Sequence, residues 1–377
     1  MNFATDIPSL SVVLPVYNAA RFLGDALNSI LAQDFRDFEC IAINDGSTDG
    51  SVEILNEYGR RDTRICVIDQ QNMGLVETLN RGISLSRAPL VARMDADDIC
   101  LPGRFAAQMR YFEGRSDLGV LGGQIKLIDE KGRYLRLVDY PAREKELEAF
   151  LLTGSPVAHP AVMFRKAAVE KAGLYRKAFR HAEDYDLWLR VHEAGYSIEN
   201  LKIPLIEYRQ HAGNVSVVHR REQALATLAA RCAHRARLAG LPDPTTDLSE
   251  LDEKIFESFP AALIADFQDE LFFVRVGMNS FETEEQSIQA LVAFERLPAD
   301  LQRTRSGARF LMQAGRGAWK RQRYFSAAAF VFRAIAVAPA KVALIVAQKL
   351  TRSLPRRLTE IFRQSRESLI SQRAPGE

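Results

Sequence analysis

Residues 90–98 read LVARMDADD, and this stretch joins an apolar run to a group of three carboxylates. Asp95 and Asp97 stand one residue apart, and Asp98 follows directly. Negative charges this close together cost free energy unless a cation lies among them, so a hard divalent metal is our first hypothesis. The alternative is a solvated turn in which Asp98 or a neighbour caps a helix that begins at Pro102.

Three further apolar segments resemble the apolar part of this stretch. Residues 10–16, 38–43 and 64–68 are short, apolar and rich in β-branched residues, and a helix-like stretch follows each. This alternation predicts an α/β fold with a mainly parallel sheet. Polar residues stand at the carboxyl ends of the runs, where open α/β sheets bind ligands, although each is also explained by capping or turn formation. They are Tyr17, Asn18, Asn44, Asp45, Gln71 and Asn72.

Five motifs occur along residues 9–220: PVYN at 15–18, NDGSTD at 44–49, NMG and LNRG at 72–74 and 79–82, MDADD at 94–98 and HAEDYDLWLR at 181–190. In their order and approximate spacing they resemble the motifs of glycosyltransferase family 2 enzymes with the GT-A fold. The resemblance implies a Rossmann-like domain that binds a nucleotide sugar. It also implies sugar transfer from a nucleotide diphosphate donor with inversion at the anomeric carbon.

The resemblance assigns the metal ligands. Asp97 is the leading ligand, and Asp95 contacts the ribose or reaches the metal through water. Asp98 orients the loop, and His211 completes the metal shell unless it is an ordinary loop histidine. A metal that bridges two phosphates stabilises the charge that grows on the leaving group. Oxygen ligands and phosphate favour Mn²⁺ or Mg²⁺ over zinc, and no Cys/His cluster in the sequence argues otherwise.

The resemblance also places the nucleotide. Tyr17 corresponds to the ring that stacks on the base, and Asp45 corresponds to the acceptor of a base N–H. Both assignments favour a uracil base and hence a UDP-sugar donor. Pro15, Asn18 and Asn72 fall in the matching motifs and are assigned to the same nucleotide site.

Asp184 matches the general base that removes a proton from the acceptor hydroxyl. The structural alternative is that Glu183 and Asp184 simply open a helix, because acids stabilise a helix N-terminus in any protein. Glu183 is grouped with Asp98, Trp188 and His159 as a residue near the acceptor or behind the base. Trp188 is expected to pack inward, and His159 to pack or form a turn, since prolines at 156 and 160 flank it.

The length of 377 residues with 47% hydrophobic content predicts two domains. Residues 1–220 are assigned to the catalytic domain and residues 221–377 to an α-helical C-terminal region, with a linker near 239–247. The first residues lack the basic start and apolar core of a signal peptide. The four cysteines show no metal spacing and are expected to be reduced packing residues of a cytosolic protein. They are Cys40, Cys66, Cys100 and Cys232.

The C-terminal region is strongly basic. Residues 303–373 contain 16 Lys and Arg against two acids, although the whole chain carries a net charge of only +2. Residues 319–339 resemble the end of one tetratricopeptide-type helix pair, and a single pair forms no solenoid. Residues 325–366 fit two interpretations: a helix held peripherally on an anionic membrane, or helices that pack on the catalytic domain or across a homo-oligomer. No nucleic-acid-binding module accompanies the charge, so nucleic acid is not an expected partner.

The sequence therefore predicts a cytoplasmic, metal-dependent, inverting enzyme that moves a sugar to a glycan or lipid-linked acceptor in cell-surface polysaccharide synthesis. A sugar nucleotidyltransferase is one alternative, but it would carry a Gly-rich loop with a basic residue after the first strand, where this chain has PVYNAARF. A noncatalytic nucleotide-sugar-binding partner is another alternative. The presence of both Asp97 and Asp184 argues against it.

Overall fold

The computed structural model describes residues 7–211 and 219–275, and farther along the chain residues 292, 294–297, 299–304, 307–308, 310–312, 314–315, 330–331, 333–336 and 342. The chain separates into two compact units, Met1–Ile264 and Ala265–Glu377. All the strands found among the described residues, and all the candidate site residues named above, belong to the first unit.

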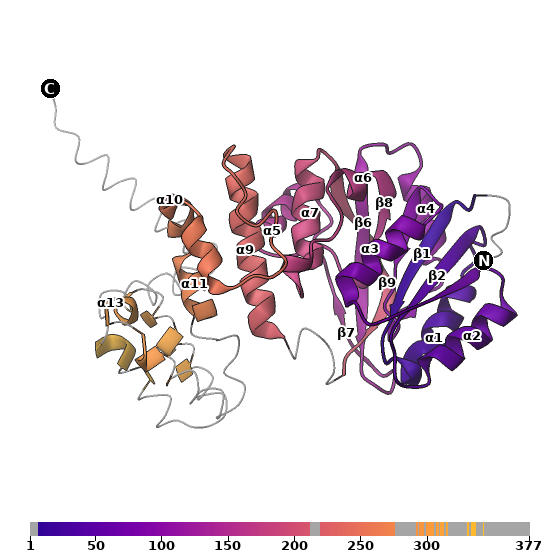
Figure 1. The fold of residues 1–377 in the computed structure, drawn as a ribbon, viewed down its shortest axis with the longest axis horizontal. Helices are drawn as coiled ribbons and strands as arrows, with labels where there is room; N and C mark the ends of the chain where they lie inside the picture. Colours follow the sequence, from indigo (N-terminus) through magenta and orange to yellow (C-terminus); the bar gives the residue numbers. More distant parts are fainter. Residues whose placement is uncertain are drawn as a thin grey trace, which may run out of the picture. The chain divides into compact units, whose positions relative to one another are not determined.

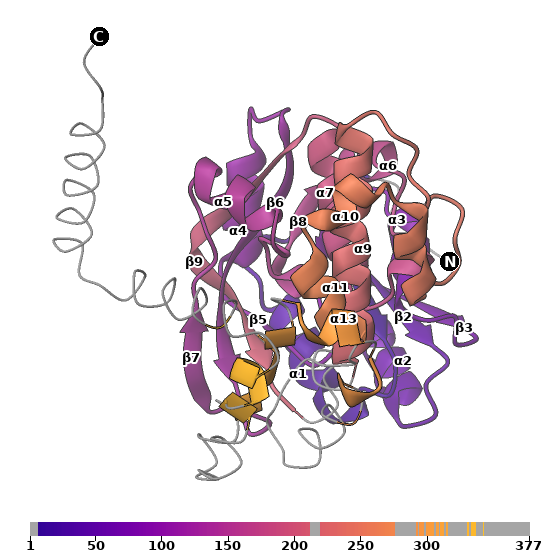
Figure 2. The same ribbon diagram turned by 90° about the vertical axis from the view of Figure 1, so that its left-hand side faces the viewer.

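The first unit is built on one sheet of nine strands within the described residues. These are β1 Leu10–Val16, β2 Phe38–Asp45, β3 Ile65–Gln70, β4 Leu90–Arg93, β5 Ile99–Cys100, β6 Leu118–Ile128, β7 Tyr134–Val138, β8 Met163–Arg165 and β9 Ser197–Arg209. The order is β3-β2-β1-β4-β8-β6-β9-β5, and β7 pairs with β6. Figure 2 shows β2 and β3 on one side of the first unit and β7 and β9 on the other. β3, β2, β1 and β4 pair in parallel, so their carboxyl ends meet at one edge. The strands expected at 10–16, 38–43 and 64–68 are β1, β2 and β3, which confirms the α/β prediction.

Helices connect the strands in the order that a parallel sheet requires. In the first unit they are α1 Ala20–Leu31, α2 Ser51–Arg61, α3 Leu75–Leu85, α4 Arg104–Phe112, α5 Glu144–Leu151, α6 Lys166–Lys171, α7 Glu183–Glu193 and α9 Arg220–Leu238, with 3-10 turns η1 His159–Ala161, η2 Lys177–Phe179 and η3 Glu253–Ser258. Beyond them lie α10 Ala261–Ala265, α11 Gln268–Arg275 and α13 Ala299–Gln302.

Side chains of β1 alternate between two helix layers. Val12 and Leu14 belong to one hydrophobic cluster with Leu27 of α1, and all three are fully buried. Val13 points to the opposite face and meets α3 at Gly82, where an added Cβ would lie 2.4 Å from Val13 Cγ1. Gly82 therefore permits the close approach of α3. Figure 1 shows β1 and β2 between α3 on one side and α1 with α2 on the other.

The helix expected from Pro102 begins two residues later. α4 starts at Arg104, because Gly103 has a φ of 76°, a left-handed conformation that cannot belong to a right-handed helix. No side chain caps α4, and Asp98 bonds elsewhere, as shown below. The interpretation of the acidic cluster as a cap for this helix is therefore wrong.

The four cysteines are free thiols. Cys40 and Cys66 lie in the neighbouring strands β2 and β3, as expected, while Cys100 lies in β5 and Cys232 in α9. Burial raises the pKa of the Cys40 thiol to about 12, so this group stays protonated at neutral pH. It is a packing residue of the β2 core.

Helix α9 belongs to the first compact unit. His234 and Arg237 of α9 bond to the carboxylate of Glu193 at the end of α7, with Arg237 Nε 2.6 Å from Glu193 Oε2. The sequence division placed residues 221–238 in the C-terminal region, whereas these contacts attach them to the unit that holds the sheet. The assignment of catalysis to residues 1–220 stays a prediction.

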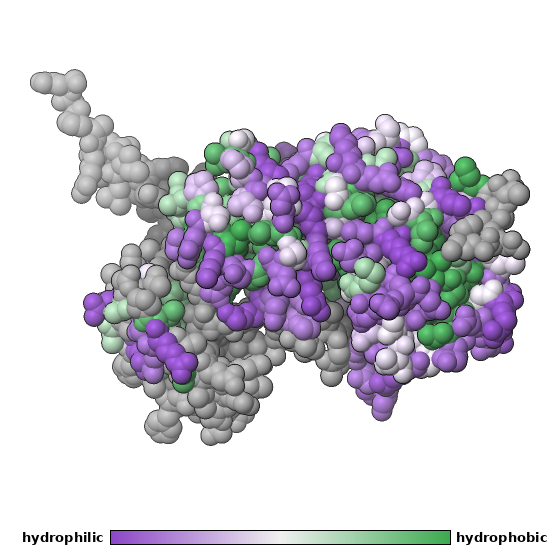
Figure 3. Space-filling view, viewed as in Figure 1, coloured by the Kyte–Doolittle hydropathy of each residue, from purple (hydrophilic) through white to green (hydrophobic). Residues whose placement is uncertain are grey.

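The basic C-terminal region lies largely outside the described residues. The helix-pair interpretation of residues 319–339 and the membrane-surface interpretation of residues 325–366 therefore stay predictions. Among the described residues, no helix has both the length and the apolar character needed to cross a bilayer. On the face that Figure 3 shows, hydrophilic residues cover most of the described surface, and hydrophobic residues appear between them in small groups.

Candidate active site

Three carboxylates follow the carboxyl end of β4. This strand ends at Arg93, and oxygen atoms of Asp95, Asp97 and Asp98 lie within 4.8 Å of one another. The cluster therefore lies at the edge where the parallel strands end, which is the usual ligand-binding edge of such sheets. The structure thus places all three carboxylates of the motif at one point.

The segment directly after β9 brings a histidine to this cluster. His211 Nε2 lies 2.8 Å from Asp97 Oδ2, although 114 residues separate the two along the chain. Asp98 Oδ1 accepts a hydrogen bond from the Arg209 backbone N–H at 2.9 Å. Asp98 Oδ2 is buried and has no hydrogen-bond partner among the described residues. A hard cation could bind here, because this unpaired Asp98 oxygen lies beside two further carboxylates and an imidazole, all of which are suitable metal ligands.

Asp95 is held by the arginine that ends β4. Both Nη atoms of Arg93 bond to the Asp95 carboxylate, at 2.8 Å between Nη1 and Oδ2. Burial raises the pKa of Asp95 to about 6, although the Arg93 charge opposes the rise. Burial and the charges of Asp97 and Asp95 hold the pKa of Asp98 well above its usual range. Both shifts disfavour the ionised carboxylates, and a bound cation would favour them.

The carboxyl end of β1 forms the neighbouring part of this edge. Pro15 pairs with Ile43 of β2, and the pairing of β1 with β4 has already ended at Val13. Asn18 has a φ of 49°, and its Oδ1 accepts a hydrogen bond from the Thr48 backbone N–H at 2.8 Å. Tyr17 is 53% exposed, so its ring is available to a ligand. The first strand therefore ends in a fixed turn that presents an aromatic ring.

Asp45, at the end of β2, fixes the loop that follows β3. Its Oδ1 accepts hydrogen bonds from Gln70 Nε2 at 2.7 Å and from the Met73 backbone N–H at 2.8 Å, and its Oδ2 accepts one from the Gly74 N–H at 2.9 Å. Asn72 is exposed within this loop. The predicted contact of Asp45 with a base is a separate role, which stays a prediction.

The first turn of α7 carries the candidate base. Asp184 is half-buried, and its Oδ2 accepts a hydrogen bond from Ser155 Oγ at 3.1 Å. Burial raises the pKa of Asp184 above its usual range. Burial and the Asp184 charge raise the pKa of Glu183 to about 7. A positioned carboxylate with a raised pKa is suited to accept a proton, so the geometry is compatible with a general base here.

Trp188 and His159 support this helix from behind. Trp188 is fully buried one turn after Asp184, and its ring centroid lies 6.1 Å from that of His159, edge to face. His159 Nε2 lies 2.8 Å from the hydroxyl of Tyr175. Burial holds the pKa of His159 well below its usual range, so the ring is neutral. Both side chains therefore belong to the packing around the first turns of α7.

Comparisons with known proteins identify the family of the chain. The family model described as Glycosyl transferase family 2 matches residues 11–173. The O-antigen biosynthesis glycosyltransferase WbnJ of Escherichia coli is 33% identical over 205 residues, which cover 54% of this chain and 80% of the relative. The chain belongs to glycosyltransferase family 2. The amylovoran biosynthesis glycosyltransferase AmsE of Erwinia amylovora is likewise 33% identical over 214 residues, or 56% of this chain and 79% of the relative.

A solved structure shares the fold of this family 2 glycosyltransferase. Residues 1–349 of TarS from S. aureus, crystallised in complex with UDP-GlcNAc, align with a TM-score of 0.52 at 18% identity. The alignment covers 86% of this chain and 90% of that chain. At this level of identity the likeness concerns the fold alone, and it confirms the GT-A fold that the motifs imply.

Three residues that the motifs did not indicate contact the predicted site residues of the glycosyltransferase. Arg93 bonds to Asp95, and Arg209 bonds to Asp98 and, through Nε, to the backbone oxygen of Asp97 at 2.9 Å. Ser155 bonds to Asp184. Arg93 has a sequence signal, because a charged residue ends the apolar run two residues before Asp95. Arg209 and Ser155 have none, since their contacts arise from segments that are distant in sequence.

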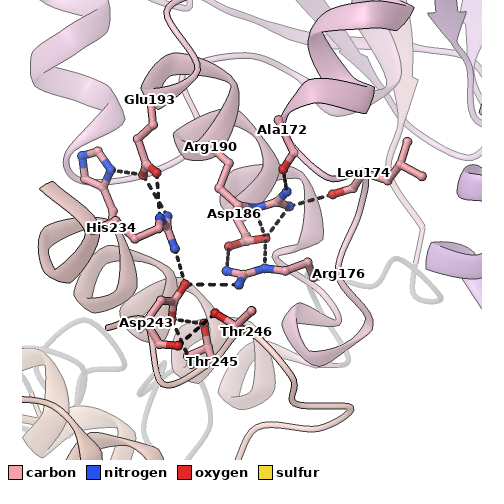
Figure 4. A network of polar contacts seen from close by, with 11 residues as sticks. Ala172, Leu174, Arg176, Asp186, Arg190, Glu193, His234, Asp243, Thr245 and Thr246 are labelled. Atoms are coloured by element: carbon pink, nitrogen blue, oxygen red, sulfur yellow. Dashed lines mark hydrogen bonds and ion pairs between the residues drawn. The ribbon is translucent and has the colours of Figure 1, made fainter. Parts of the chain in front are cut away.

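A network of ion pairs fixes α7 from its buried side (Figure 4). Asp186 is fully buried, and Arg176 and Arg190 both donate to it, with Nε to Oδ2 distances of 3.0 Å in each pair. Arg176 also reaches Asp243, at 3.2 Å, and Asp243 in turn pairs with Arg237 of α9. The helix that carries Asp184 is thereby tied to η2, to α9 and to the segment after α9.

The Asp186→Asn variant is expected to lose about 3 to 5 kcal/mol of unfolding free energy, because it leaves the buried Arg190 and the partly buried Arg176 without their shared carboxylate. Urea unfolding of the variant and of the wild type measures the difference. The exposed Glu148→Gln on α5 serves as the control and should change stability by less than about 0.5 kcal/mol. A loss below about 1 kcal/mol for Asp186→Asn would show that this network does not hold α7.

The stability of the protein should also report the raised pKa of Glu183. Its pKa is about 7 in the folded chain against an ordinary value of 4.5, so the folded state binds the extra proton and stability falls as pH rises through this window. Glu183→Gln removes the buried charge and should raise the melting temperature at pH 8 but hardly at pH 5. Melting curves at both values test this, and an equal shift at the two pH values would contradict it.

Proposed function

We propose that this chain is a metal-dependent, inverting glycosyltransferase of the hexosyl type. It would move a sugar from a UDP-sugar to a hydroxyl of a glycan or lipid-linked acceptor, in the cytoplasm and in cell-surface polysaccharide synthesis. One observation carries the proposal: the Asp95, Asp97, Asp98 and His211 cluster and the half-buried Asp184 occur in one compact unit. The names of WbnJ and AmsE support a role in polysaccharide synthesis, and the UDP-GlcNAc complex of TarS supports a uridine donor.

The residues at the carboxyl edge would bind the donor. Asp97 and His211 would hold Mn²⁺ or Mg²⁺, with Asp95 and Asp98 beside them. When bound, such a metal neutralises charge that develops on the diphosphate. The exposed Tyr17 would stack on the base, and Asp45 and Asn72 would bond to the nucleotide.

Asp184 would activate the acceptor. Its carboxylate accepts the proton of the acceptor hydroxyl while that oxygen attacks the anomeric carbon on the face opposite the diphosphate. The bond from the anomeric carbon to the phosphate oxygen breaks, and the nucleoside diphosphate leaves with the electron pair. Attack from the opposite face inverts the anomeric configuration.

Thermal stabilisation by a panel of nucleotide sugars, with and without Mn²⁺ or Mg²⁺, tests the proposal. A donor present at a hundred times its dissociation constant should add about 2.7 kcal/mol of stability. The stabilising donor is then incubated with candidate acceptors, and release of the nucleoside diphosphate is measured. A nucleotidyltransferase would instead release pyrophosphate from a nucleoside triphosphate, and a noncatalytic partner would bind the donor without turnover.

A further inference from the structure

Phe150 is an exposed aromatic residue in the last turn of α5. It is 43% exposed, whereas Leu147 and Leu151 of the same helix are buried and each only 4% exposed. Leu152, directly after the helix, is 54% exposed. The end of α5 therefore has an apolar surface that is not part of the core. A single exposed apolar side chain is ordinary, so its surroundings decide what it can bind.

Two hydrogen bonds hold the segment after Phe150 on the turn that carries the candidate base. The hydroxyl of Tyr185 donates to the Leu151 backbone oxygen at 2.6 Å, and the hydroxyl of Ser155 donates to Asp184 Oδ2 at 3.1 Å. Asp184 and Tyr185 are consecutive residues in the first turn of α7. The chain that follows Phe150 is thus fixed to α7 at both of its ends.

The Phe150 ring lies beside the loop that reaches the base. The backbone N–H groups of Thr153 and Gly154 both donate to the Phe150 backbone oxygen, at 2.8 and 2.9 Å, so α5 ends in a tight turn. A Cβ on Gly154 would lie 3.9 Å from Phe150 Cε1, which places the ring next to this glycine. Gly154 directly precedes Ser155, and Ser155 contacts Asp184. One residue therefore separates the ring from the contact with the base.

The chemistry around the ring fits a sugar better than a lipid surface. Lys145, Glu146 and Glu148 are exposed on the same helix, and this excess of acids opposes binding to an anionic membrane. The group that comes next to the base is the sugar ring whose hydroxyl Asp184 would deprotonate. Such a ring has apolar C–H faces and a polar edge of hydroxyls. An exposed aromatic ring close to a carboxylate complements both.

We propose that Phe150 is an acceptor-binding residue: its ring stacks on the C–H face of the acceptor sugar that presents its hydroxyl to Asp184. The inference rests on the proposed function of Asp184 as the base. It assigns to the site a subsite for a glycoside, and it names the side chain that binds the sugar ring there.

Substitution of Phe150 should act on the acceptor and not on the donor. Phe150→Ala should raise the acceptor KM about tenfold and leave kcat at saturating acceptor nearly unchanged, because stacking holds the ground state and the transition state alike. Phe150→Trp keeps a flat ring and should retain an acceptor KM within about twofold of the wild type. The donor KM and the Mn²⁺-dependent binding of UDP should match the wild type in both variants.

Turnover is measured as nucleoside diphosphate released from the donor that the thermal screen identifies. The acceptors are the methyl and octyl glycosides of glucose, galactose and N-acetylglucosamine. Leu135→Ala is the matched control, because Leu135 is 49% exposed on β7, and its loss should leave the acceptor KM unchanged.

Two results would contradict the stacking of a sugar on Phe150. If Phe150→Ala lowers the melting temperature or kcat but leaves the acceptor KM unchanged, the residue has a structural role only. If the acceptor KM rises for octyl glycosides but not for methyl glycosides, the ring binds an alkyl chain and not a sugar. The inference fails in either case.

A binding measurement separates the inference from the proposed function. Phe150→Trp places an indole at the proposed subsite, and Leu135→Trp places one on β7. Glycosides of the panel, added without donor, should change the fluorescence emission of Phe150→Trp but not that of Leu135→Trp or the wild type. No change with any glycoside overturns the inference whether or not the enzyme turns over. A change in Phe150→Trp without nucleoside diphosphate release by the wild type supports the subsite and overturns the proposed function instead.

Discussion

Asp97→Asn is expected to abolish sugar transfer while the fold survives. The Asp97 side chain is 28% exposed, and its backbone oxygen is held by Arg209 Nε at 2.9 Å, so the loop keeps its anchor when the carboxylate is lost. The negative charge disappears, and an amide with a single oxygen replaces the carboxylate proposed to bind the metal beside His211. Loss of metal stabilisation of the leaving diphosphate amounts to several kcal/mol, which is roughly a thousandfold or more in kcat.

Calorimetry of UDP binding with and without Mn²⁺ measures this effect directly. The wild type should bind UDP more tightly in the presence of Mn²⁺, and Asp97→Asn should lose this difference. Asp34→Asn, in an exposed loop after α1, removes one carboxylate elsewhere and should retain it. Unchanged Mn²⁺-dependent binding by Asp97→Asn would remove Asp97 from the site.

The strands and the acidic cluster could be predicted because both depend on local sequence. Apolar segments rich in β-branched residues alternate with helices. Consecutive parallel strands then place their carboxyl ends at one edge of the sheet, independently of the loop conformations. β1 begins and ends at the residues of the expected run, 10–16. Asp95, Asp97 and Asp98 are neighbours in the chain, so their proximity in space required no knowledge of the fold.

Contacts between distant segments could not be read from these patterns. His211 was assigned to the metal by family resemblance, but its position 2.8 Å from Asp97 depends on how β9 pairs with β6 and β5. Ser155 reaches Asp184 from a loop whose shape no periodicity specifies. The start of α4 was misplaced because the conformation of Gly103 decides it, and a glycine accepts either sign of φ.

The burial of Arg93 at the end of β4 could not be predicted from the sequence either. In the run LVAR the arginine occupies a position that would ordinarily mark the solvated end of the strand. The structure buries it, because Asp95 lies two residues ahead and folds back onto its guanidinium. A buried charge requires such a partner, and only the three-dimensional path of the chain after β4 supplies it.

Asp184→Asn is expected to lower kcat by roughly 10² to 10⁴ and to leave nucleotide affinity nearly intact. The substitution keeps the size of the side chain and an oxygen that can accept the hydrogen bond from Ser155, so the first turn of α7 should keep its geometry. It removes the basic lone pair that takes the acceptor proton. Because Asp184 should act on the acceptor alone, UDP binding with Mn²⁺ should match the wild type.

The neighbouring acid makes this test sharper. Glu183 is 6% exposed, and burial and the Asp184 charge raise its pKa to about 7, so part of this group is protonated near neutral pH. Glu183→Gln should therefore reduce kcat much less than Asp184→Asn when both are measured at saturating donor and acceptor at pH 8. If Glu183→Gln has the larger effect, Glu183 is the base. Near-normal turnover of both variants would exclude a carboxylate base on α7, and with it the reaction chemistry proposed for this glycosyltransferase.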